Sequence, residues 1–228
     1  TSVNTTAGFS IVSYTGTGSA GTLGHGLSAV PKMIILKERV GTENWMVYHA
    51  GNTSAPETDY LLLNATSATA DFPVWNDTAP TSSVFSIGTD SSTSTSGDTY
   101  ITYLFAEKQG FSKFGNYSGV LSAGASATGS PFVYTGFRPA FLMVKSNSHT
   151  EQSMIIDNKR NPHNNGSKLL SATVADAEGD QDPGIDFYSN GFGINYGTGS
   201  IGSSGKDYIY MAFAEAPFVN SKGVPANA

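Results

Sequence analysis

Carboxylates gather in one short stretch of the sequence, and oxygen ligands of this kind hold divalent cations or serve as acid and base in glycan cleavage. The strongest candidates for a cation site are Asp180, Asp182 and Asp186. The alternative is a solvated loop, because glycine and proline interrupt the run. We favour the loop and expect no essential metal. The carboxylates of the stretch are Asp176, Glu178, Asp180, Asp182 and Asp186.

A tryptophan beside an amide and a carboxylate forms a second candidate site. Sugar rings present C–H faces that stack on aromatic rings, and hydroxyls that bond to amides and carboxylates. Trp75, Asn76 and Asp77 are adjacent in the sequence, and Pro73 and Pro80 on either side indicate an exposed turn. The alternative for Trp75 is packing in the core. We predict that this segment binds a ligand.

The second half of the chain offers Tyr188 near the matching place, beside Asp186 and Phe187. Trp45 and Tyr48 are better explained by packing, because an apolar strand needs large side chains in its core. The ligand-binding candidates are therefore Trp75, Asn76, Asp77 and Tyr188.

Patterns typical of enzymes are missing from the sequence. It has no Gly-x-Ser-x-Gly elbow, no glycine-rich phosphate loop with lysine and no paired-histidine zinc helix. The chain has no cysteine, which excludes thiol nucleophiles, disulfides and cysteine-ligated metals. We expect no catalytic residue, no enzymatic activity and no cofactor. The histidines are isolated from one another: His25, His49, His149 and His163.

Composition narrows the classes of partner. Only 13% of the 228 residues are charged, and the net charge is −6. Nucleic-acid binding normally needs a basic surface, so we expect no nucleic-acid partner. No apolar run approaches the roughly 18 residues of a membrane-spanning helix, and we expect no membrane insertion. The lack of cysteine fits a protein made in a reducing cytoplasm that functions outside it.

The elements that position these residues follow from an internal repeat with an offset of 108 residues. Residues 97–107 match residues 205–215, with six of the eleven positions identical. At the same offset, residues 31–37 and 139–145 both read proline, mostly apolar residues, then lysine. After the loss of one residue, Phe85 pairs with Phe192. The repeat predicts a first domain at residues 1–109, a second at 110–219 and a flexible tail at 220–228.

Short β-branched and aromatic runs recur about every 10–15 residues and are separated by the turn residues Gly and Pro. Six or seven strands in each half predict an all-β protein of two tandem, structurally similar β-sandwich domains of the jelly-roll or lectin-like kind. In the last strand of the first half, a period of two puts Ile101, Tyr103 and Phe105 on one face. We predict that this face packs in the core.

The motifs of both halves resemble a repeated domain of tail-fibre and other structural proteins from phages of cyanobacteria and marine bacteria. The resemblance covers nearly the whole chain. It implies a setting in the virion, and closed, commonly three-fold, symmetry. The motifs that carry it are residues 8–9 with 14–16, 24–27, 60–64, 105–107, 110–117 and 132–139.

The leading hypothesis is a virion structural protein, a tail-fibre or adhesin module at the virion surface that binds host-surface polysaccharide. Such a chain is made in the bacterial cytoplasm. Its other partners are virion proteins and further copies of itself, as a homo-oligomer and by resemblance a trimer. One alternative is a capsid decoration or tail-collar protein with no glycan ligand. A second, which we expect least, is a glycan-degrading enzyme of the tailspike type.

Overall fold

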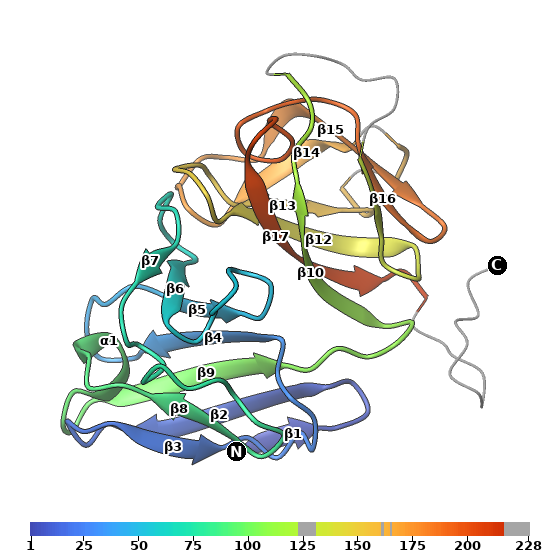
Figure 1. Ribbon diagram of the computed structural model, residues 1–228. Helices are drawn as coiled ribbons and strands as arrows, with labels where there is room; N and C mark the ends of the chain where they lie inside the picture. Colours follow the sequence, from blue (N-terminus) through green and yellow to red (C-terminus); the bar gives the residue numbers. More distant parts are fainter. Residues whose placement is uncertain (123–130, 161, 165, 217–228) are drawn as a thin grey trace. The chain divides into compact units, whose positions relative to one another are not determined.

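The computed structural model describes residues 1–122, 131–160, 162–164 and 166–216, and leaves out the side chains of 166–167 and 179–183 (Figure 1). The chain divides into two compact units, Thr1–Glu107 and Lys108–Ala228. The sequence repeat had placed the boundary after residue 109. The predicted tail at 220–228 lies outside the described residues. No helix in the described part of the chain has the length and apolar character to cross a membrane.

Unit 1 is built from β-strands and one helical turn. Its seven-stranded sheet has the order β1-β2-β9-β4-β5-β6-β7, and β3 pairs with β8 in a second, two-stranded sheet. The one-turn helix α1 (Ser91–Ser94) is capped by Asp90, whose side chain accepts a hydrogen bond from the Ser92 N–H. The strands are β1 (Ser2–Asn4), β2 (Phe9–Thr15), β3 (Gly21–Gly24), β4 (Met33–Glu38), β5 (Met46–His49), β6 (Asp59–Leu62), β7 (Ala70–Asp71), β8 (Val84–Ile87) and β9 (Thr99–Phe105).

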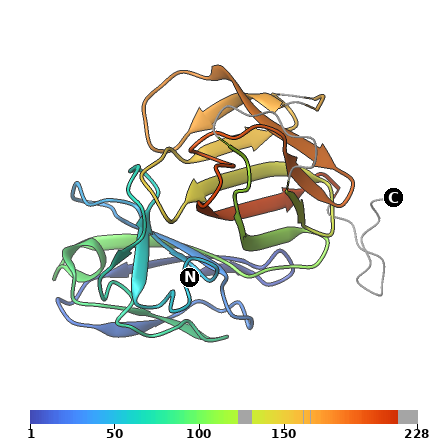
Figure 2. The same ribbon diagram turned by 45° about the horizontal axis from the view of Figure 1, so that its top comes forward.

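Unit 2 carries the corresponding strands in one continuous eight-stranded sheet with the order β10-β17-β12-β13-β14-β15-β16-β11 (Figure 2). All of the pairings in this sheet are antiparallel. The strands are β10 (Ser112–Ser118), β11 (Phe132–Tyr134), β12 (Pro139–Ser146), β13 (Met154–Asp157), β14 (Gly166–Ser171), β15 (Gly179–Tyr188), β16 (Gly191–Ile194) and β17 (Asp207–Ala214).

The two units share one topology. In unit 1 the last strand, β9, lies between β2 and β4. In unit 2 the last strand, β17, lies between β10 and β12 in the same way. The β3–β8 pair of unit 1 corresponds to β11–β16 of unit 2. The units differ where β15 is long enough to pair with β16 and so join the two layers, whereas β7 has two residues and ends before β8. Two β-sandwich halves, as the repeat predicted, are confirmed.

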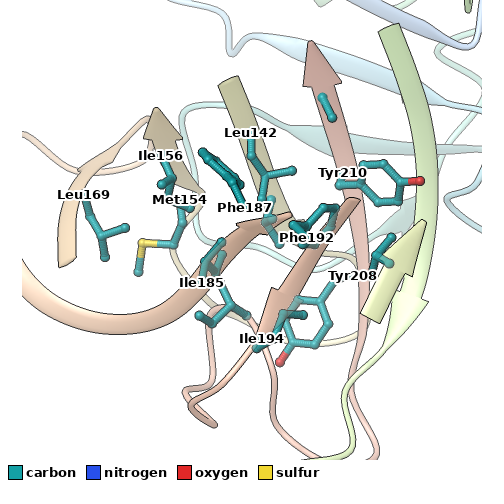
Figure 3. Packing of buried hydrophobic residues seen from close by; sticks show 14 of the residues in the cluster. Leu142, Met154, Ile156, Leu169, Ile185, Phe187, Phe192, Ile194, Tyr208 and Tyr210 are labelled. Atoms are coloured by element: carbon teal, nitrogen blue, oxygen red, sulfur yellow. The ribbon is translucent and has the colours of Figure 1, made fainter. Parts of the chain in front are cut away.

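Each unit has its own hydrophobic core between its layers. In unit 1, Val12, Ile34 and Leu104 from the large sheet pack with Phe85 and Ile87 of β8. In unit 2, Figure 3 shows strands β12 to β17 directing apolar side chains into one cluster. Its labelled members are Leu142, Met154, Ile156, Leu169, Ile185, Phe187, Phe192, Ile194, Tyr208 and Tyr210.

The prediction for the core face of the last strand is wrong. In β9 the residues that point into the core are Tyr100 and Leu104, with Thr102 and Ala106 on the same buried face. Ile101, Tyr103 and Phe105 lie on the opposite face and are only half-buried. The period of two is real, but this central strand has large apolar residues on both faces, so alternation by itself does not identify the inner one.

Candidate functional site

Two strands of unit 2, which lie on either side of β16, place aromatic residues on one outer face. On β15, β16 and β11, Tyr188 lies opposite Gly191, and Gly191 lies opposite Tyr134. In the next row of that face, Asp186 lies opposite Gly193, and Gly193 opposite Phe132. Directly paired residues project from the same face of a sheet. We call the residues of these two rows the aromatic platform: Phe132, Tyr134, Asp186, Tyr188, Gly191 and Gly193.

The glycines of the middle strand allow the rings to lie across it. A Cβ atom on Gly191 would come 2.7 Å from Cζ of Phe132, and one on Gly193 would come 2.8 Å from Cε2 of Tyr188. Both distances are shorter than real contacts of a Cβ. Glycine inside a strand often marks such a close approach. The two rings therefore cover the backbone of β16 with one face.

The other side of the platform faces solvent. Phe132 is 48% exposed, Tyr134 is 65% exposed and Tyr188 is 40% exposed. The ring centroids of Phe132 and Tyr188 lie 5.9 Å apart, and their planes are inclined by 57°. Single exposed apolar residues are common on proteins, but a group of three on the two strands that flank β16 forms a patch typical of binding surfaces.

Polar groups border the rings on one side. The hydroxyl of Tyr188 donates to Oδ2 of Asp186 at 3.2 Å, and the Asn195 amide donates to the same oxygen. Partial burial, followed by the negative charge of Asp186, raises the pKa of the Tyr188 hydroxyl. This tyrosine therefore stays protonated at neutral pH, as a hydrogen-bonding group at the edge of an aromatic surface.

The strands of the platform are fixed from below by the core. Ile185 and Phe187 alternate with Asp186 and Tyr188 along β15 and point inward, as Phe192 does between the two glycines (Figure 3). Strand β14 begins at Gly166, opposite Ile185, so among the described residues Phe187 has no backbone partner on that side and bonds to side chains instead. The Phe187 N–H donates to Oδ1 of Asn164 at 3.1 Å, and Nη1 of Arg138 donates to the Phe187 carbonyl at 3.2 Å.

Unit 1 has the same strand pair without the aromatic rings. Leu23 pairs with Phe85 there, as Val133 pairs with Phe192 in unit 2. The outward positions of unit 1 hold Thr22 opposite Ser86 and Gly24 opposite Val84. The sandwich therefore closes without a platform. The fold does not account for the three exposed rings of unit 2.

The structure places the predicted tryptophan elsewhere. Trp75 is 1% exposed and packs in the core of unit 1, with its ring edge-on to Tyr48 at 6.0 Å. Our expectation of an exposed turn is wrong for this ring, which has no free face for a sugar. Asn76 and Asp77 do form an exposed turn, with positive φ values of 52° and 45°. Of the four predicted ligand-binding residues, Tyr188 lies in the platform, and Asp186, predicted as a cation ligand, lies there too.

Sequence reasoning missed Phe132 and Tyr134. A signal was present, because aromatic residues alternate in residues 132–134 and glycines alternate in residues 191–193, each with the period of a strand. What the sequence does not show is that these two segments pair.

The sequence had indicated that the acidic stretch is a loop, and this is wrong for most of it. Asp180, Asp182 and Asp186 lie on strand β15, while Asp176 lies in the loop before it. Glu178 forms an ion pair with Lys168 at 3.3 Å. The side chains of Asp180 and Asp182 lie outside the description, and among the described residues no three metal-ligating side chains gather in one place.

Two serines of unit 2, Ser146 and Ser148, contact Nδ1 of His149, and Ser146 makes the shorter contact. The hydroxyl of Ser146 bonds to Nδ1 of His149, and Nε2 of His149 bonds to the Gly199 carbonyl at 2.7 Å. A nucleophile needs access to its substrate. Ser146 is fully buried, so this pair supports the fold by holding the loop that contains Gly199.

Comparisons with known proteins give one family. The model of a domain of unknown function (DUF7483) matches residues 1–217. No curated protein matches the chain. Among solved structures, the crystal structure of the STIV MCP aligns over 90% of this chain and 85% of that one, with 12% sequence identity and a TM-score of 0.24. A TM-score this low carries no argument about fold or function.

Proposed function

The chain belongs to the family of the domain of unknown function DUF7483, and we propose that it is a carbohydrate-binding module of a phage virion. In this proposal, unit 2 binds host-surface polysaccharide on the aromatic platform. Unit 1 repeats the sandwich without that site. The module has no enzymatic role.

One observation carries the proposal. Three aromatic rings are exposed side by side across a strand whose outward residues are glycine, and the same place in unit 1 has none. Exposing apolar rings is unfavourable in water unless a partner covers them. The C–H faces of sugars stack on such rings, while Asp186 and Asn195 at the border supply hydrogen bonds to sugar hydroxyls.

The virion setting rests on separate support. The tandem repeat and its motifs resemble phage tail-fibre proteins, and the sequence combines low charge with a complete lack of cysteine. Within this proposal, the chain works at the virion surface as a homo-oligomer, a trimer by resemblance, beside other virion proteins. If each platform binds glycan weakly, several copies around a symmetry axis would bind one polysaccharide together and so raise the overall affinity.

A glycan array tests the carbohydrate part. The wild-type chain is expected to bind a subset of glycans, and Tyr188→Ala or Tyr134→Ala to abolish that binding. Phe72→Ala is the matched control, since Phe72 is 47% exposed and lies in unit 1. Binding that survives both tyrosine substitutions contradicts the proposed site. An array without signal for the wild-type chain contradicts the function and favours a purely structural virion protein.

Electron microscopy of intact particles, labelled with an antibody against the chain, tests the virion setting. Label on fibres supports an adhesin, and regular label over the capsid supports a decoration protein instead. Particles without any label contradict the setting altogether.

A further inference from the structure

We infer that the aromatic platform binds a single, soluble glycan chain of uncharged sugars, and binds neither anionic polysaccharides nor the flat face of a crystalline polysaccharide. This inference rests on the proposed function, because it names the class of ligand for the same site. Two features of the platform carry it: the angle between its rings and the charges around them.

The angle between the rings sets the shape of the ligand. Phe132 and Tyr188 are inclined by 57°, with centroids 5.9 Å apart. Two rings can lie flat on one crystalline face only if they are nearly coplanar. Rings inclined this far instead fit two sugar units whose own planes turn relative to each other, as they do in a free, twisted chain.

Contacts with the strand beneath them and with Asp186 hold the rings at this inclination in the structure. Each ring lies directly over a glycine of β16, with Phe132 over Gly191 and Tyr188 over Gly193. The hydroxyl of Tyr188 donates to Asp186 at 3.2 Å, which favours this direction of the ring. The inclined arrangement is therefore the one that a ligand meets on this surface.

The charges around the platform select against anions. Asp186 lies in the platform itself, in the same row as Gly193 and Phe132. Two cations on elements next to it are each bound by a carboxylate: Nε of Arg138 lies 2.7 Å from Glu215, and Nζ of Lys168 lies 3.3 Å from Glu178. Like charges brought close together repel each other.

The same carboxylate favours uncharged sugars. A carboxylate accepts hydrogen bonds from hydroxyls, and charge-assisted bonds of this kind are stronger than neutral ones. Neutral hexoses carry several hydroxyls around each ring, whereas uronic and sulfated sugars place anionic oxygens at some of those positions.

The experiment compares three probes on the full chain: a soluble neutral β-glucan, soluble alginate as the anionic polymer, and microcrystalline cellulose. Calorimetry and sedimentation with the solid phase measure binding at low and high salt. We expect the neutral soluble chain to bind with little dependence on salt, because stacking is not screened by ions. We expect no binding to alginate or cellulose. The glycan array adds further neutral and anionic glycans to this comparison.

Two variants connect the result to the platform. Tyr188→Ala is expected to lower the affinity for the neutral glycan at least tenfold, whereas Phe72→Ala is expected to leave it unchanged. Asp186→Asn removes the charge while keeping the shape, and it is expected to raise the affinity for anionic glycans relative to neutral ones. Circular dichroism and melting temperature show whether each variant is folded.

The outcomes separate the two proposals. Binding of anionic or crystalline polysaccharides through Tyr188 overturns this inference and leaves the carbohydrate-binding function in place. An unchanged preference in Asp186→Asn overturns the part that concerns charge. A failure of the wild-type chain to bind any member of the three classes overturns the proposed function itself.

Discussion

Tyr117 and Tyr208 stack nearly parallel in unit 2, with ring centroids 5.1 Å apart and planes 17° apart. Tyr14 and Tyr100 repeat this arrangement in unit 1, at 5.0 Å and 13°. In both units the hydroxyls reach the segment before the last strand, which contains helix α1 in unit 1. Tyr208 donates to the Gly199 carbonyl at 2.8 Å, and Tyr100 donates to the Ser91 carbonyl at 2.7 Å. The pair is thus a repeated clamp between the sheet and that segment.

Loss of one hydroxyl from this clamp is expected to destabilise the chain. In Tyr100→Phe, the Ser91 carbonyl loses one of its two hydroxyl donors and keeps that of Thr95, while the Thr95 N–H loses the acceptor that it has at 2.8 Å. A buried polar group left without a partner costs about 1–3 kcal/mol, and because the Thr95 N–H is only partly buried we expect a loss of about 1 kcal/mol. Denaturant titration measures the loss. Tyr134→Phe serves as the control, since Tyr134 is well exposed, and an equal effect in both variants would contradict the role of the clamp.

Burial of Trp75 predicts a large difference between two neighbouring aromatic residues. Trp75→Ala removes a fully buried ring from the core of unit 1 and is expected to cost about 3–5 kcal/mol. Phe72→Ala is expected to cost less than about 1 kcal/mol, because Phe72 is largely exposed. Urea unfolding of both variants gives the comparison. A folded, stable Trp75→Ala variant that no longer binds glycans would contradict the burial of Trp75 and indicate that its ring contacts the sugar.

Acid is expected to destabilise unit 1 through His25. This histidine is fully buried; its Nε2 contacts the Thr81 carbonyl at 3.2 Å, and its Nδ1 accepts the Leu27 N–H at 3.1 Å. Burial lowers the pKa of His25 below the ordinary 6.5. The unfolded chain therefore binds the proton first, and stability is lost as pH falls from about 6.5 to the lower folded pKa, by up to ~1.4 kcal/mol per pH unit.

Urea titrations at pH values from 8 to 5 measure this loss. His25→Gln is expected to remove part of the pH dependence, even if it lowers stability at every pH. His163→Gln is the control, because His163 is exposed. Equal pH profiles for the wild type and His25→Gln would show that another group is responsible.

Gly193→Ala is expected to separate binding from stability. The added Cβ would meet the Tyr188 ring, which can move, and no backbone atom is among its near neighbours. Unit 1 holds Ser86 at the corresponding position, so the strand accepts a side chain there. We expect a shift in melting temperature of a few degrees at most, together with a clear loss of neutral-glycan binding. Gly191→Ala provides the contrast, since its Cβ would also clash with the Val133 carbonyl and should lower stability. Undiminished glycan binding by folded Gly193→Ala would argue against the position of the Tyr188 ring.

The sequence by itself determined the class and the duplication of this protein. Apolar runs of strand length, punctuated by glycine and proline, leave few alternatives to an all-β fold. The match of residues 97–107 to 205–215 requires two similar units, because the same local pattern of side chains buries the same kind of core twice. Tyr188 was also identified from its neighbours in the chain.

Only the tertiary structure decided which faces are inside and what the site contains. Leu104 and Phe105 are adjacent and both apolar, and the layer that packs against β9 selects Leu104 for the core. Trp75 is buried for the same reason, although the two residues after it, Asn76 and Asp77, are polar. The platform joins Tyr134 of β11 to Tyr188 of β15 through the glycines of β16. Pairing of strands distant in sequence depends on the closure of the whole sandwich, and no local pattern of residues encodes it.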